Sequence, residues 1–141
     1  MNKKGLTIVE LLVVVALLAF LILATFPDMQ AFFNCLEINS CLRTVSAALS
    51  TARYQAIQEN QPVRAEVVCG CLQLSKDDGQ GWKVFRSFDL GRKIAVHANS
   101  CPVFSPLGNV APLCTITLEK HERVYRVVVS MFGRIKVYSN G

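Results

Sequence analysis

The chain opens with a long apolar run, and its pattern changes afterwards. Residues 6–26 are apolar except for Glu10 and two threonines. At about 1.5 Å per residue, a helix over this run would measure roughly 31 Å, close to the hydrocarbon thickness of a bilayer. Lys3 and Lys4 precede the run. The positive-inside bias therefore predicts a single membrane span with its N-terminus in the cytoplasm.

Beyond Pro27, apolar residues recur at the spacing of a helix with one buried face. The stripe consists of Ile38, Cys41 or Leu42, Val45, Ala48 or Leu49, Ala52 and Ala56. This pattern predicts an amphipathic segment over 28–61 that packs on the rest of the chain. A proline inside a helix removes a hydrogen bond and bends the axis. We therefore expect one long, bent helix that ends at about Glu59.

From Pro62 onward the pattern is typical of β-structure. Short segments rich in Val, Ile, Thr and aromatic residues alternate with turn signals. The expected strands lie within 63–74, 82–88, 94–98, 115–119, 123–130 and 133–139, with a turn over 75–81. Since the helix precedes all the strands, we expect an α+β fold in which an antiparallel sheet packs on the helical stripe.

Glu10 is the anomalous residue of the apolar run. A buried carboxylate costs several kcal/mol unless it is paired or protonated, so a carboxylate near the start of a membrane span indicates a function. A cleaved secretory signal would require a small-residue site after the run, and LATFPDM offers none. A plain membrane anchor would explain the length of the run but not its carboxylate.

The segment GLTIVELLVV, residues 5–14, resembles the prepilin processing motif of type IV pilins and type II secretion pseudopilins. The resemblance implies that prepilin peptidase cuts between Gly5 and Leu6 and that the new N-terminus of Leu6 is methylated. It also implies that Glu10 pairs with the N-terminal amine of a neighbouring subunit during assembly. Leu6 stands where the family usually has phenylalanine. The implied division is a leader over 1–5, a membrane and filament-core helix over 6–27, an amphipathic half over 28–61 and a globular pilin-like domain over 62–141.

The C-terminal part resembles the GspH/FimT group of minor pseudopilins and pilins. The resemblance rests on an F-x-P-x-G turn, a T-I-x-L strand, a V-V-V-S strand and a closing G-R-x-R segment. These elements fall on Phe104, Pro106 and Gly108, on Thr115, Ile116 and Leu118, on 126–130, and on Gly133, Arg134 and Lys136. Lys136 replaces an arginine, which keeps the charge but loses the bidentate fork.

The basic charge lies mainly in the C-terminal part, where 62–141 carries 11 basic and 6 acidic side chains. Ordinary solubilising charge is one interpretation. Resemblance to the FimT branch implies another, in which the closing segment binds DNA for uptake. Arg134 and Lys136 alternate along the last expected strand, and Arg126 and Arg123 are further candidates. Such residues would contact phosphates without base specificity and in a salt-sensitive way.

The functional hypotheses are therefore a minor type IV pilin that helps prime assembly, with or without DNA binding, and a minor pseudopilin of a type II secretion system. The implied partners are other pilins or pseudopilins, prepilin peptidase, the inner membrane and, in the DNA-uptake hypothesis, DNA. The expected location is the inner membrane, with the globular domain in the periplasm, and then the pilus or pseudopilus.

The six cysteines suggest an oxidising compartment. In a continuous helix, Cys35 and Cys41 would lie about 9 Å apart along the axis and about 120° apart around it, beyond disulfide reach. Cys69 and Cys71 would share one face of a strand, too far apart to bond. Cys101 and Cys114 flank a turn-rich loop, and a bridge between them would stabilise the fold by roughly 3 kcal/mol. We therefore prefer this pair as a disulfide.

Nothing in the sequence resembles a catalytic or metal-binding set, so we expect a protein that is not an enzyme and has no cofactor. His97 and His121 are isolated from nucleophile or carboxylate arrangements. Asp77, Asp78 and Gly79 are typical of a turn, since the alternating oxygen ligands of a calcium loop are missing.

Overall fold

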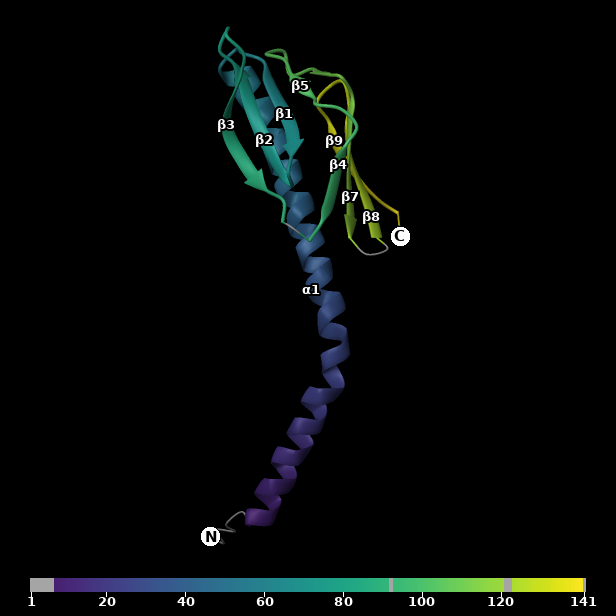
Figure 1. Cartoon of the computed structure of the whole chain (residues 1–141). Coiled ribbons are helices and arrows are strands. Elements are labelled where there is room, and N and C mark those ends of the chain that lie inside the picture. Colours follow the sequence, from purple (N-terminus) through teal and green to yellow (C-terminus); the bar gives the residue numbers. More distant parts are fainter. Residues whose placement is uncertain (1–6, 92, 121–122, 141) are drawn as a thin grey trace, which may run out of the picture. The chain divides into compact units, whose positions relative to one another are not determined.

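The computed structural model describes residues 7–91, 93–120 and 123–140. For residues 25–28, 31 and 140, only the backbone is described. Gly5 and Leu6, at the expected cleavage site, lie outside the described residues, as do Lys3, Lys4 and His121. Figure 1 shows a long helix followed by β-strands, as the sequence predicted.

Helix α1 spans Ile8–Gln58 and continues through Pro27 without a break in its helical backbone. The chain divides into two compact units between Glu37 and Ile38. Among the described residues, the first unit holds the first part of α1, and the second unit holds the rest of α1 and the strands.

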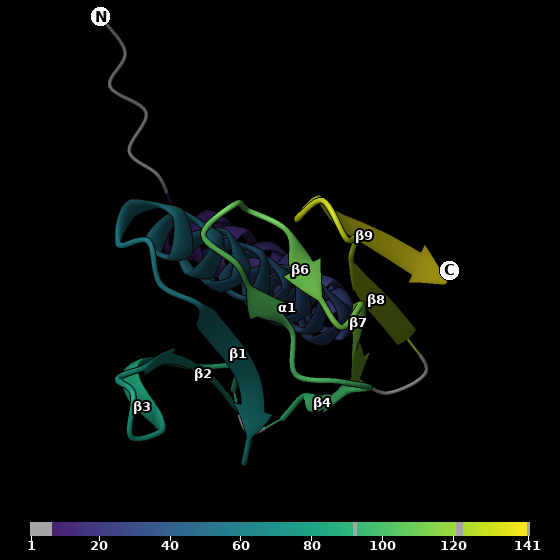
Figure 2. The same ribbon diagram turned by 90° about the horizontal axis from the view of Figure 1, so that it is seen from above.

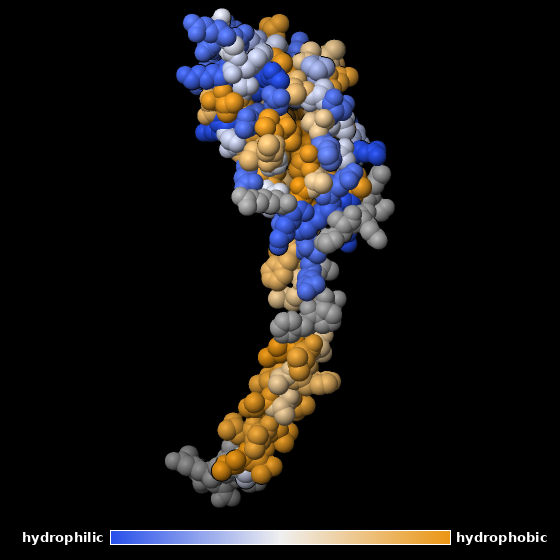
Figure 3. All heavy atoms as spheres, in the orientation of Figure 1, coloured by the Kyte–Doolittle hydropathy of each residue, from blue (hydrophilic) through white to orange (hydrophobic). Residues whose placement is uncertain are grey.

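From Ile8 to Leu23, the first unit exposes apolar side chains on every side of the helix, and the lower part of the helix is mostly orange in Figure 3. Every large apolar side chain from Ile8 to Leu23 is at least 47% exposed. Among the described residues, no helical segment combines the length and the apolar character required to cross a membrane.

In the second unit, the helical stripe is buried as predicted. Its members are all at most 8% exposed: Ile38, Cys41, Leu42, Val45, Ala48, Leu49, Ala52 and Ala56. They pack in one core with strand residues that include Leu72, Phe104 and Ile116. The small side chains of the stripe alanines allow the sheets to approach the helix closely. Burial of the larger side chains supplies most of the hydrophobic stabilisation.

The strands form two antiparallel sheets instead of the single sheet expected. The strands are β1 (Val63–Val68), β2 (Cys71–Asp77), β3 (Trp82–Asp89), β4 (Ala95–Ala98), β5 (Val103–Phe104), β6 (Val110–Ala111), β7 (Cys114–Lys120), β8 (Arg123–Val129) and β9 (Ile135–Asn140). Their order is β3-β2-β1-β5-β6 in one sheet and β4-β7-β8-β9 in the other. Strands β1–β3 and strands β7–β9 lie on different sides of α1 in Figure 2. The predicted α+β class is confirmed.

One expected strand proved to be a hairpin. The sequence analysis treated 63–74 as a single extended segment, but Cys69 and Gly70 have φ angles of 49° and 77°. Val68 pairs with Cys71 across this two-residue turn. Positive φ at both central residues matches the turn type that best fits the twist of a hairpin. Cys69 therefore lies in a turn and Cys71 in β2, so the prediction that both lie in one strand was wrong.

Candidate functional sites

The start of α1 is closed by a reciprocal set of hydrogen bonds between Thr7 and Glu10. The Glu10 carboxylate accepts hydrogen bonds from Thr7 N (3.0 Å) and Thr7 Oγ1 (3.1 Å), and Glu10 N donates to Thr7 Oγ1 (3.3 Å). This is a capping box, which satisfies backbone donors that a helix start would leave without partners. This role of Glu10 was not predicted, although the T-x-x-E spacing of Thr7 and Glu10 is the sequence signal of a capping box.

Three of the four candidate DNA-binding residues come together on the outer face of the four-stranded sheet. Val127 and Val129 are fully buried, so the alternate positions of β8 point away from the core. Arg126 is one of these positions and pairs with Tyr138, and Val128 pairs with Lys136. Arg134 immediately precedes β9, is exposed, and lines one hollow together with Lys136. We call Arg126, Arg134 and Lys136 the basic face.

Arg123 is separated from the basic face. It pairs with Lys120 at the other end of β8. Because Arg123 and Arg126 are three residues apart, their side chains leave opposite faces of the strand. Arg123, a further candidate in the sequence, therefore does not share the basic face with the other three residues.

A hollow opens on the basic face. Val128, Ser130, Phe132, Arg134, Lys136 and Tyr138 line it. Phe132 is 69% exposed and Tyr138 is 51% exposed. Two cationic side chains and two aromatic rings thus surround the same open space.

The turn that carries Phe132 is locked by backbone hydrogen bonds. Gly133 N donates to Ser130 O and Ser130 N donates to Arg134 O, both at 2.9 Å. The turn between β5 and β6 repeats this pattern, with Gly108 N donating to Ser105 O at 2.9 Å. Both glycines have positive φ, 80° at Gly108 and 70° at Gly133, which favours glycine at these positions.

These two turns pack against each other and against Arg53 of α1. Val110 N donates to Met131 O at 2.8 Å, and Arg53 Nη1 donates to Gly133 O at 3.3 Å. A β-carbon built on Gly133 would lie 2.7 Å from Gly108 O and 2.8 Å from Arg53 Nε. The glycines of the F-x-P-x-G and G-R-x-K segments therefore permit one close contact, which positions the β8–β9 turn beside the basic face.

Arg53 has no role predicted from the sequence. Its Nε atom is buried and has no hydrogen-bond partner among the described residues. No local pattern could have found this contact, because Gly133 lies 80 residues away in the chain.

Two family models match the chain. A model described as a prokaryotic N-terminal methylation motif matches residues 1–26. The model described as type II transport protein GspH matches residues 42–133, well over half of the chain. The chain belongs to the GspH family. The GspH match includes both glycine turns and ends immediately before Arg134, so Arg134 and Lys136 lie beyond it.

Solved structures show the same fold. The type IV minor pilin FimU of Pseudomonas aeruginosa strain PAO1 is 17% identical, with a TM-score of 0.63 over 76% of this chain and 92% of FimU. The minor pseudopilin EpsH of the type 2 secretion system of Vibrio cholerae is 15% identical, with a TM-score of 0.57 over 70% of this chain and 94% of EpsH. No curated protein matches the chain. This GspH-family chain therefore shares its fold with a minor pilin and with a minor pseudopilin.

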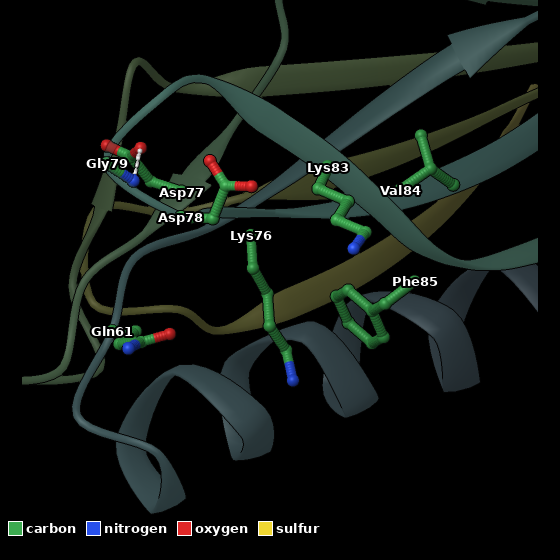
Figure 4. A pocket seen from close by; sticks show the side chains of 8 residues that line it. All are labelled: Gln61, Lys76, Asp77, Asp78, Gly79, Lys83, Val84 and Phe85. Carbon is green, nitrogen blue, oxygen red and sulfur yellow. Dashed lines mark hydrogen bonds between the residues drawn. The ribbon is translucent and has the colours of Figure 1, made fainter.

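The hairpin of β2 and β3 encloses a second hollow, shown in Figure 4. Lys76 points toward the end of α1, and its Nζ donates to both carboxylate oxygens of Glu59, the residue after α1, at 2.5 and 2.6 Å. The same Nζ lies 4.3 Å from the centre of the Phe85 ring of β3. Asp77 and Asp78 accept hydrogen bonds from the backbone of Gly79 and Gln80. Lys76 therefore anchors the hairpin to Glu59, and the two aspartates stabilise the turn between β2 and β3.

Within the described part of the chain, no group of three or more His, Cys, Asp or Glu residues is arranged to hold a metal ion. His97 lies in β4 and pairs with Thr117 of β7, in the four-stranded sheet.

All six cysteines lie among the described residues, and the structure holds them as thiols. The bridge between Cys101 and Cys114 is therefore not formed in it. Cys114 instead faces the core and donates to Ser100 O at 3.2 Å. Burial raises the pKa of the Cys114 thiol, while its hydrogen bond to Ser100 lowers the pKa in part. Oxidation of Cys101 and Cys114 to a disulfide stays a prediction.

Thiol labelling of this GspH-family chain is expected to follow exposure. At pH 8, Cys69, which is exposed, should react first with iodoacetamide, and Cys114 should react last because burial and its raised pKa lower the thiolate fraction. The rate at Cys114 should rise with pH. Peptide mass spectrometry without reductant measures each site. If Cys101 and Cys114 are both protected from alkylation and a reductant removes this protection, the bridge is established. If both are labelled without reductant, the bridge is excluded.

Proposed function

We propose that the chain is a minor pilin that is anchored in the inner membrane by its N-terminal helix and is then incorporated into a pilus, where it helps to prime assembly. The observation that carries the proposal is the exposure of large apolar side chains all around the segment from Ile8 to Leu23. A helix that is apolar on every side is stable in water only when other apolar groups cover it. A membrane and then a bundle of similar helices would provide that cover.

Prepilin peptidase is the proposed processing enzyme, and Gly5–Leu6 the proposed site. The match of residues 1–26 to the N-terminal methylation motif supports this assignment. When the full chain is produced with a prepilin peptidase, we expect it to lose residues 1–5 and to begin with a methylated Leu6. Intact-mass and N-terminal peptide analysis check this. A Gly5→Asp variant should keep its leader, and cleavage elsewhere in the wild type would refute the assignment.

A second proposed function is binding of DNA for uptake through the basic face. Its support is the exposure of Arg126, Arg134 and Lys136 on the outer face of the four-stranded sheet. Cations at such positions bind phosphates and release counterions, so affinity falls as salt rises. The alternative for the whole chain is a minor pseudopilin of a type II secretion system, which would have no need for this affinity.

The DNA proposal is tested with the full chain in a neutral detergent. We expect binding to a duplex at low salt, with the slope of log K against log salt reduced by about 1.8 in Arg134→Ala/Lys136→Ala. Lys83→Ala removes an exposed cation from the other sheet and is the matched control. Absence of binding at low salt would favour the secretion alternative.

A further inference from the structure

The basic face carries more than positive charge. Phe132 and Tyr138 line the same hollow as Arg134 and Lys136, and both rings are more than half exposed. The hollow measures about 550 Å³, within the roughly 300–1,000 Å³ typical of sites that bury small ligands. A surface that only attracted phosphates would gain nothing from two exposed rings beside its cations.

Lys136 and Tyr138 share one face of β9, because alternate residues of an extended strand point to the same side. Arg134 immediately precedes β9 and lines the same hollow as these two residues. Tyr138 also pairs directly with Arg126 of β8. One ring is thus placed between cations on neighbouring strands, and the second ring lies in the adjacent β8–β9 turn. This row alternates groups that bind phosphates with a flat apolar surface.

Alternation of cations and exposed aromatic rings suits unpaired nucleotides. The cations follow the phosphates, while each ring can stack on one base, and stacking tolerates any sequence because every base has a π-face. In a duplex the base faces are already stacked on one another and only their edges are accessible in the grooves. A duplex could therefore use the cations of this face but not its rings.

We propose that the basic face is a binding site for single-stranded nucleic acid, in which Arg134 and Lys136 bind phosphates and Tyr138 and Phe132 stack on bases. The inference rests on the proposed DNA binding and deepens it, since it names the form of nucleic acid that the face prefers. The close contact of Arg53 with Gly133 holds the turn that presents Phe132.

The test compares one oligonucleotide in three forms: single-stranded, paired with its complement, and single-stranded with abasic sites. The full chain in neutral detergent is used, with the variants Phe132→Ala/Tyr138→Ala and Arg134→Ala/Lys136→Ala. We expect the single strand to bind at least tenfold more tightly than the duplex. The aromatic variant should lose roughly tenfold or more in affinity for the single strand for each ring removed, and little in affinity for the duplex. Its slope of log K against log salt should be unchanged.

The abasic strand should bind the wild type as weakly as the normal strand binds the aromatic variant. The first pair lacks the bases and the second lacks the rings, so neither pair can stack. Phe132→Tyr and Tyr138→Phe keep the rings and should keep the affinity, which separates stacking from damage to the fold. Equal affinity for single strand and duplex, with aromatic variants that bind like the wild type, would overturn the inference and leave DNA binding intact. Failure to bind either form would overturn the DNA proposal itself.

Discussion

A Glu10→Gln chain is expected to be processed like the wild type and yet to stay out of filaments. Glutamine retains a side-chain oxygen that can accept the hydrogen bonds from Thr7 N and Oγ1. The helix start should therefore stay capped. What the substitution removes is the negative charge, which in the proposed assembly pairs with the terminal amine of a neighbouring subunit. Loss of one partner of a buried ion pair costs about 3–5 kcal/mol, so incorporation should fall more than tenfold.

The measurement is the ratio of the chain in sheared filaments to the chain left in membranes, by quantitative immunoblot. Thr7→Val is the matched control, because it removes the hydroxyl of the capping box and keeps the charge of Glu10. It should cost the helix about 1 kcal/mol and leave incorporation near the wild-type level. If Glu10→Gln assembled normally while Thr7→Val did not, Glu10 would act as a cap and not as an assembly contact.

The helical part of the fold could be predicted because its signals are local. The eight stripe positions recur at the period of one helix face, and all eight are buried. The β part was harder. The Cys69–Gly70 turn lacks the Asn-Gly or Asp-Gly pair that usually marks a two-residue hairpin, so a break in an otherwise continuous β pattern went unrecognised. The division of strands into two sheets depends on which strands pair at long range, and alternation along one strand carries no such information.

The candidate sites divide in the same way. Arg134 and Lys136 could be assigned to one face from their two-residue spacing, which is a local property. The placement of Arg126 beside them and the exclusion of Arg123 required the register of β8 with β9. The contact of Arg53 with the β8–β9 turn required the whole tertiary fold, since it joins a helix to a turn 80 residues away. Nothing in the sequence distinguishes Phe132 from an ordinary turn residue or Tyr138 from an ordinary strand residue. Only the shared hollow shows that both lie beside the cations.

A Gly133→Ala substitution is expected to be the most damaging single-methyl change among the turn glycines. Alanine at φ 70° is strained by about 1–2 kcal/mol. The added β-carbon would also lie 2.7 Å from Gly108 O, a backbone atom of the neighbouring turn, and 2.8 Å from Arg53 Nε. Overpacking of this kind costs about 1–3 kcal/mol. We therefore expect the free energy of unfolding to fall by about 2–5 kcal/mol, measured by denaturant titration of the full chain in neutral detergent.

Two other glycines separate strain from crowding. At Gly79, φ is 83° and no atom lies within 4 Å of an added β-carbon, so Gly79→Ala should cost only the strain. At Gly108, φ is 80° and the nearest atoms, Arg53 Nε and Ile57 Cδ1 at 3.3 Å, belong to the ends of flexible side chains that can shift by a few tenths of an ångström. The expected order of destabilisation is Gly133→Ala, then Gly108→Ala, then Gly79→Ala. An equal loss of unfolding free energy at Gly133 and Gly79 would mean that the turns of Gly108 and Gly133 can move apart at little cost in free energy. In that case neither their contact nor Arg53 would hold the β8–β9 turn in place beside the basic face.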